Sequence, residues 1–196
     1  MSEDALELQM LIRAAQKGDE QAFEVLLGRF QTPIYRYVFA ILGNRTDAED
    51  VTQEVFIKLW RTLPRYRFDA SFSTYLTKIA HHAAHDALRT RARRSRVSSL
   101  DTPDDPDAEP LPIPDTDVQN DPVEAYLSQE KSEMLQRALL SLPDDMREII
   151  TLRAVQGLDY AQMAAVLSLP EGTIKSRLHR ARNFLIKMLE SGNFFA

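Results

Sequence analysis

The chain has 196 residues and no cysteine, which excludes disulfides, cysteine-ligated zinc and thiol catalysis. The net charge of −5 conceals an uneven distribution, because residues 98–125 contain nine acidic residues and no Lys or Arg. The rest of the chain is therefore basic, with one basic run at 89–96 and a second on a helix near the C-terminus.

No segment of the sequence indicates a membrane or secretion signal. The N-terminus lacks the basic region of a signal peptide, and the longest apolar runs, such as 37–42, are far too short to cross a bilayer. We therefore expect a cytoplasmic protein with no membrane insertion.

Apolar residues recur at helical spacing nearly everywhere and strand-like alternation is absent, which predicts an all-α fold. In the first half of the chain, helices are expected at about 3–17, 20–29, 33–43, 47–63 and 72–96. Thr46 and Glu49 form the pattern of a capping box before the fourth of these helices, and Pro64 ends it. Ser71 or Ser73 is expected to cap the fifth.

A stretch rich in Pro, Asp and Thr interrupts the helices at 98–121 and holds few large apolar side chains. Such a segment buries too little apolar surface to offset its loss of conformational entropy, so we interpret it as a flexible acidic linker. The sequence thus predicts one helical domain at 1–97 and a second at 122–196. The second is expected to begin with helices at about 122–140 and from Pro143 to Gly157.

The most informative local pattern follows Gly157. Asp159 and Gln162 form a capping-box pair ahead of a short helix at 160–167, which the turn Ser168–Pro170 ends. The next helix has an apolar stripe made of Ile174, Leu178, Ala181, Leu185 and Met188. Its other faces alternate short polar and long cationic side chains. This arrangement is typical of a helix-turn-helix whose recognition helix enters a major groove, although the pattern alone also fits an ordinary helical hairpin with a solvated basic face.

Three blocks of sequence carry a family resemblance. They are residues 47–60 (DAEDVTQEVFIKLW), the FSTYLTKIA that begins at Phe72, and the run from Leu142 to Arg182. Together they resemble the extracytoplasmic-function, or group-four, sigma factors of the sigma-70 family, which contain only a region-two and a region-four domain. The resemblance implies a bacterial RNA polymerase sigma factor that directs promoter-specific transcription initiation.

By this resemblance, the helix-turn-helix recognises the duplex of the promoter −35 element. The candidate contact residues on the recognition helix are Thr173, Lys175, Ser176, Arg177, His179 and Arg180. Arg and Lys hydrogen-bond either guanine or phosphate, and a helix N-terminus can hold a phosphate, so the sequence leaves open which residues contact bases. His179 departs from the family, in which an aromatic or aliphatic residue is frequent at this position.

The resemblance assigns capture of the melted −10 strand to the first domain. Unstacked bases bind to aromatic side chains and to cations that follow the backbone. The candidate residues are Arg65, Tyr66, Arg67, Phe68, Ser71, Thr74, Lys78 and His82. From the pattern alone, Tyr66 and Phe68 are equally expected to pack on the core beneath the loop. His82 stands where the family commonly has Asn.

The outer face of the helix at 47–60 is charged. Its exposed candidates are Asp47, Glu49, Asp50, Gln53, Glu54 and Lys58. Such a face is usually only solvated, but the resemblance implies that this one docks on the clamp helices of the polymerase β′ subunit. The implied partners are core polymerase, through its β′ and β subunits, promoter DNA and an anti-sigma factor. The linker is then expected to pass through polymerase channels near the active centre, or to act as a plain spacer.

Other classes of function find little support. His81 and His85 are spaced to share a metal ion, but no third ligand is evident and the stretch is expected to face solvent, so we predict no metal site and no cofactor. The sequence has no P-loop, dinucleotide-binding turn or nucleophile motif that would indicate an enzyme. The alternative is a helix-turn-helix transcriptional regulator that binds duplex DNA independently of core polymerase. The block at 47–60 and the aromatic, basic loop argue against it, because a sensor domain needs neither.

Overall fold

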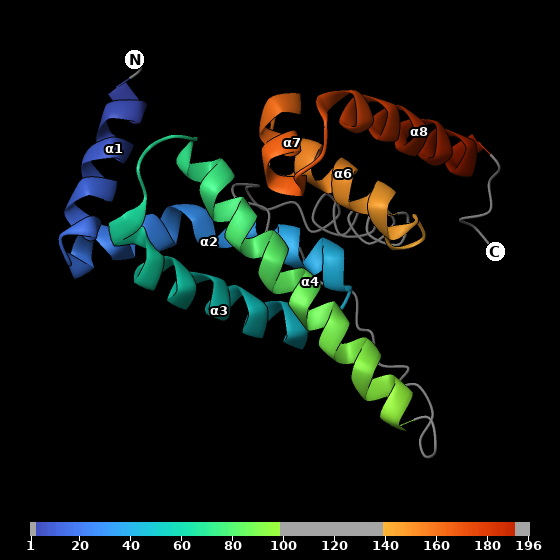
Figure 1. The fold of residues 1–196 in the computed structure, drawn as a ribbon, viewed down its shortest axis with the longest axis horizontal. Coiled ribbons are helices and arrows are strands. Elements are labelled where there is room, and N and C mark those ends of the chain that lie inside the picture. Colours follow the sequence, from blue (N-terminus) through green and yellow to red (C-terminus); the bar gives the residue numbers. More distant parts are fainter. Residues whose placement is uncertain (1–2, 99–138, 191–196) are drawn as a thin grey trace, which may run out of the picture.

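The computed structural model describes residues 3–98 and 139–190, and all regular structure in these ranges is helical (Figure 1). The N-terminal domain consists of α1 (Glu3–Gln16), α2 (Glu20–Leu42), α3 (Arg45–Thr62), a short 3₁₀ helix (Leu63–Arg65) and α4 (Phe72–Ser98). The C-terminal domain consists of α6 (Asp144–Ala154), α7 (Tyr160–Leu167) and α8 (Glu171–Glu190). The predicted linker and the helix predicted at 122–140 lie outside the described residues, apart from their ends.

The expected separation into two helices around Pro33 is wrong, because α2 continues from Glu20 to Leu42 with Pro33 inside it. A proline in a helix interior removes one backbone hydrogen bond and costs about 3 kcal/mol. Apolar side chains on both sides of Pro33, including Leu26, Ile34 and Tyr37, are all fully buried in one core. Their burial outweighs the cost of the proline, so the helix does not break.

The start of α3 also differs from the prediction. Gly43 ends α2 with a left-handed backbone (φ 68°), and Asn44 then adopts an extended conformation. The Asn44 side chain accepts a hydrogen bond from the Asp47 amide at 2.9 Å, so Asn44 caps the helix in place of the expected Thr46. The helix therefore begins before the predicted capping box.

Other predicted helix ends are confirmed. Ser71 accepts a hydrogen bond from the Thr74 amide at 3.1 Å, and Asp159 with Gln162 forms both bonds of a capping box at α7. On α8, Ile174, Leu178 and Ala181 are buried as the apolar stripe requires. The side chain of Met188 lies outside the described residues.

The long helix α4 is the part of the N-terminal domain that faces the C-terminal domain, together with α2 (Figure 1). It packs against α2 and α3 on one side and against α7 on the other, while α6 packs against α2. The buried apolar side chains of both domains therefore form one continuous cluster. Gln156 adds polar contacts across this interface, since it donates to the Pro33 carbonyl at 2.7 Å and accepts from the Thr77 hydroxyl at 3.2 Å. Within the described ranges, no helix is both long and apolar enough to cross a membrane.

Candidate nucleic-acid interfaces

The helix-turn-helix is built by two local signals in the sequence. The capping box at Asp159 starts α7, and Ser168 ends it in a left-handed conformation (φ 55°) with its amide bonded to the Ala164 carbonyl. The Pro170 carbonyl then accepts from the amides of Thr173 and Ile174, which begins α8. Helix α6 packs against α8 and, over a smaller area, against α7, and so supports both helices of the motif.

The polar face of α8 is accessible. Lys175, Ser176, His179 and Arg180 are exposed, and Thr173 and Arg177 are partly exposed. The Lys175 ammonium lies 5.5 Å from the centre of the Tyr160 ring, a cation–π contact that joins the two helices of the motif. His179 hydrogen-bonds to Asn183 at 3.1 Å. The residues predicted to contact a −35 duplex are thus presented together on one helix.

The loop between the 3₁₀ helix and α4 divides the residues predicted to contact single-stranded DNA. Arg65 and Arg67 are exposed and Phe68 is partly buried, but Tyr66 is only 8% exposed. Tyr66 donates a hydrogen bond to the Ala70 carbonyl at 2.7 Å, and its ring contacts the rings of Phe68, Phe72 and Tyr75. Burial of the phenol raises the pKa of Tyr66 and is the largest of the causes that do so. Tyr66 therefore packs into the core, as the second interpretation of the loop proposed, and is not a surface platform in this arrangement.

Phe68 has a left-handed backbone (φ 63°), which directs the chain from the 3₁₀ helix back to α4. The Arg13 guanidinium lies 5.5 Å from the centre of the Phe68 ring. Gln16 in α1 donates to the carbonyls of Leu63 and Tyr66 at 3.0 and 2.8 Å. The first helix thus fixes the loop that carries the exposed arginines.

On α4, the candidates for strand contact are also unequal. Ser71, Lys78 and His82 are exposed, whereas Thr74 is only 4% exposed. Desolvation of the imidazole, followed by the nearby charges of His81 and Lys78, lowers the pKa of His82 and favours its neutral form. The Gln162 side chain of α7 donates to the Ser71 hydroxyl at 3.2 Å. The C-terminal domain therefore covers one edge of this candidate surface.

The outer face of α3 is more apolar than the sequence suggested. Five of the predicted residues, Glu49, Asp50, Gln53, Glu54 and Lys58, are exposed, and Asp47 is partly exposed. Ile57 and Trp60 are also 54% and 37% exposed on this helix. Ile57 follows Glu54 by three positions and Gln53 by four, and Trp60 follows Ile57 by three, so helical spacing could have indicated this from the sequence. An apolar patch rimmed by charges is typical of a protein-docking surface.

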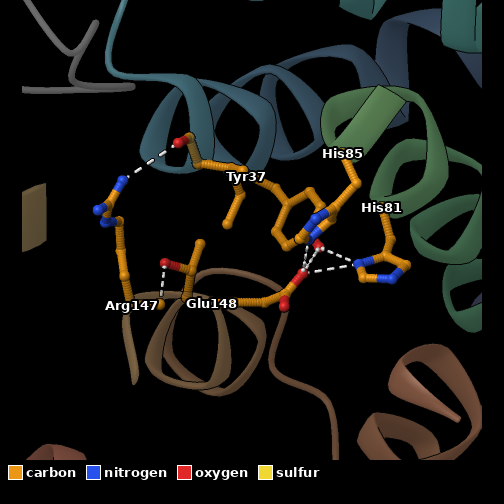
Figure 2. Close-up of polar contacts among 7 residues, drawn as sticks. Tyr37, His81, His85, Arg147 and Glu148 are labelled. Atoms are coloured by element: carbon orange, nitrogen blue, oxygen red, sulfur yellow. Dashed lines mark hydrogen bonds and ion pairs between the residues drawn. The ribbon is translucent and has the colours of Figure 1, made fainter. Parts of the chain in front are cut away.

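The three histidines of α4 do not all face solvent, which corrects the sequence-based expectation. His81 Nδ1 and His85 Nε2 lie 2.6 and 2.9 Å from Oε1 of Glu148, which comes from α6, so the structure supplies a third group (Figure 2). Burial raises the pKa of Glu148, but hydrogen bonds to His81 and His85 outweigh it and lower the pKa to about 2. The bond to Glu148 raises the pKa of His85. Glu148 lies 67 residues from His81, and no local pattern marks it.

Comparisons with known proteins find a matching family model for each of the two domains. The family model described as sigma-70 region 2 matches residues 26–94, and that described as sigma-70, region 4, matches residues 132–185. The RNA polymerase sigma-H factor of Pseudomonas aeruginosa is 34% identical over 188 residues, covering 93% of each chain. The ECF RNA polymerase sigma-E factor of Escherichia coli is 37% identical over 174 residues, covering 89% of this chain and 90% of that protein.

Solved structures share the fold. CnrH, in complex with the cytosolic domain of CnrY, has a TM-score of 0.66 and 23% identity, covering 93% of this chain and 97% of its own. The sigma factor RpoE from Bartonella quintana, in complex with the anti-sigma factor NepR, has a TM-score of 0.68 and 24% identity, covering 87% of this chain and 98% of its own.

In its described residues the chain is an all-helical protein of two domains, and the matches to both domains mark it as a DNA-binding transcription factor. Its matches extend over both domains and over nearly the full length of the relatives. The chain belongs to the sigma-70 family, among the extracytoplasmic-function sigma factors of RNA polymerase.

Proposed function

We propose that this sigma factor joins core RNA polymerase and directs it to promoters by holding two separate elements. The recognition helix α8 binds the −35 duplex, through Lys175, Ser176, Arg177, His179 and Arg180 with Thr173 at its N-terminal turn. The observation that carries the proposal is the presence, in one chain, of the region-two and region-four matches, each with exposed cations among the residues predicted to contact DNA.

In the N-terminal domain, the melted −10 strand binds to the exposed members of the predicted set. These are Arg65, Arg67, Phe68, Ser71, Lys78 and His82. The two arginines and Lys78 follow the phosphates, and Phe68 offers a partly exposed ring on which a base can stack, worth about 1–3 kcal/mol. Tyr66 and Thr74 do not contact the strand directly, because both are buried. Their burial supports a role in shaping the loop and the start of α4.

Core polymerase docks on the outer face of α3, with the clamp helices of the β′ subunit as the proposed partner. The charged residues Asp47, Glu49, Asp50, Gln53, Glu54 and Lys58 form the rim, and Ile57 with Trp60 forms an apolar centre. We expect Asp50→Lys to weaken core binding several-fold by reversing a rim charge. Glu7→Lys is the matched control, since it reverses an exposed carboxylate on α1, which packs against α2 and the 3₁₀ helix.

A dedicated anti-sigma factor is the second proposed protein partner. Sharing a fold with CnrH, solved with CnrY, and with the sigma factor RpoE, solved with the anti-sigma factor NepR, supports this part of the proposal. The chain itself catalyses no step, since the polymerase forms the phosphodiester bonds, and it acts where the polymerase acts, in the cytoplasm.

The test is run-off transcription with the purified chain and sigma-free core polymerase on promoter fragments. Specific transcripts that depend on the chain are the expected result. A chain that binds duplex DNA sequence-specifically by itself, yet never joins core polymerase, would instead be an independent regulator.

A further inference from the structure

Three side chains from the two domains converge on one point. His81 and His85 lie one turn apart on α4, and Glu148 reaches them from α6 (Figure 2). Their nitrogens lie 2.6 and 2.9 Å from the same carboxylate oxygen, and the ligand-type atoms of the three residues all lie within 4.8 Å of one another. Within the described ranges, this is the one such group of three or more His, Asp or Glu residues.

Two imidazoles and one carboxylate are a recurrent ligand set for zinc, in which water occupies the fourth position. Zinc bonds of about 2.0–2.2 Å place the donor atoms of a tetrahedral site about 3.3 Å apart. The observed nitrogen–oxygen distances of 2.6 and 2.9 Å are shorter by about 0.7 and 0.4 Å, so the carboxylate has to rotate away from His81 to make room for an ion. The side chains of His81 and Glu148 are only 15% and 11% exposed, which limits competition from water, while that of His85 is 36% exposed.

The surroundings fit an ion site as well. The Tyr37 hydroxyl donates to Oε1 of Glu148 at 3.3 Å, and such outer hydrogen bonds orient carboxylates that bind metals. A cavity of about 280 Å³ borders His85 and Glu148 and offers a path for the ion and its water. Arg89 and Arg147 also line this cavity, but each pairs with a carboxylate three positions away, Asp86 and Asp144.

We propose that His81, His85 and Glu148 bind a divalent transition-metal ion, with zinc the best match to the ligands, and that this ion ties α6 to α4. Mixed imidazole and carboxylate ligands suit zinc better than magnesium or calcium, which prefer oxygen alone. Because one ligand comes from one domain and two from the other, bound metal favours the arrangement in which the domains are packed together. Availability of the ion then regulates how readily the two DNA surfaces separate.

The first experiment measures binding of Co²⁺ to the full, chelator-treated chain, without DNA or polymerase. Four-coordinate Co²⁺ absorbs in the visible range, so we expect a band that saturates at about one ion per chain and disappears when Zn²⁺ competes. Absence of a band overturns the proposal, and no variant is needed for that result. Failure here leaves the sigma-factor function intact, since that function is tested by transcription.

Variants locate the ion. Glu148→Gln and His85→Ala should each weaken Co²⁺ binding about tenfold or more, and Tyr37→Phe about tenfold through loss of the outer bond. His82→Ala is the matched control for metal binding, because His82 is adjacent in sequence but exposed and outside the cluster. Circular dichroism shows whether each variant is folded. Equal affinity in Glu148→Gln and His82→Ala would place the ion elsewhere and overturn the assignment.

A third measurement tests the tie between domains. The chain has no cysteine, so spin labels can be attached specifically at Arg61→Cys on α3 and Lys187→Cys on α8, both exposed in the native chain. Zn²⁺ should narrow the distribution of distances between the labels, and Glu148→Gln should abolish this effect. An ion that binds without changing the distribution would overturn the regulatory role.

Discussion

Arg180 and Arg182 are both exposed on α8, and two positions along a helix turn their side chains by about 200°. We expect Arg180→Ala to weaken binding of the polymerase holoenzyme to a −35 duplex by about 1–3 kcal/mol, with a smaller loss on a scrambled duplex. Arg182→Ala removes the same charge from the other flank and should change affinity less, and equally for both duplexes. Titration of labelled duplexes at fixed salt measures this. An equal loss for Arg180→Ala on both duplexes would show that Arg180 contacts phosphate.

Tyr66 and Phe68 are distinguished by burial. Tyr66→Ala should lower the free energy of unfolding by about 3–5 kcal/mol, because a buried aromatic ring leaves a cavity. Tyr66→Phe keeps the ring and loses only the hydrogen bond to Ala70, so we expect a loss of about 1 kcal/mol. Phe68→Ala should destabilise less than Tyr66→Ala, yet weaken binding of a −10 single strand. Urea unfolding and strand titration separate the two roles; a larger loss of stability in Phe68→Ala would contradict them.

Single residues on one helix were predictable because helical spacing fixes which face they share. The α8 stripe and its polar face follow directly from that spacing, as does the burial of Val51, Val55 and Leu59 on α3. The loop gave no such rule, so the sequence left the burial of Tyr66 open. Glu148 was not predictable at all, because its partners come from another domain and their meeting depends on tertiary packing.

At the scale of elements, the capping box of α7 is the most testable feature. Helix α7 has only eight residues and packs against both α4 and α8, so its start positions the whole motif. Asp159→Ala should lower the free energy of unfolding by about 1 kcal/mol, since the backbone N–H of Gln162 loses the Asp159 carboxylate as its acceptor. Asp159→Asn is the matched control, because Asn caps about as well, and should be nearly neutral. Thermal unfolding compares the two variants. An equal loss of stability in Asp159→Ala and Asp159→Asn would mean that the charge of Asp159 matters and its capping hydrogen bond does not.

Helix boundaries were predictable where side chain and backbone signals agreed. Asp159, Ser71 and Gly18 ended or began helices as expected, because each supplies a cap or a left-handed turn locally. Pro33 misled because its local cost competes with burial along the whole of α2, which no window of a few residues contains. Asn44 was overlooked because Thr46 offered the more familiar pattern two residues later.

At the scale of the whole molecule, the packing of the two domains is the feature that the sequence could not supply. The predicted linker gave two domains but no relative placement, since a flexible connection permits many. The structure brings α7 against α4 and Gln162 against Ser71, at one edge of the proposed −10 surface. Under the proposed function, the −10 strand has to reach this surface, and Gln162 covers its edge while the domains are packed. The packed arrangement is therefore expected to lower the population that is competent to bind a promoter.

A reversible crosslink tests this expectation. Thr32 is exposed beside Pro33, whose carbonyl accepts from Gln156, so Thr32→Cys with Gln156→Cys can be joined across the interface by a cleavable bifunctional reagent. We expect the joined chain to lose about tenfold or more in run-off transcription, because the competent population falls. Reduction of the reagent's disulfide should restore the transcripts in the same sample, which controls for both substitutions. Undiminished transcription by the joined chain would show that promoter binding does not require the domains to separate at this interface.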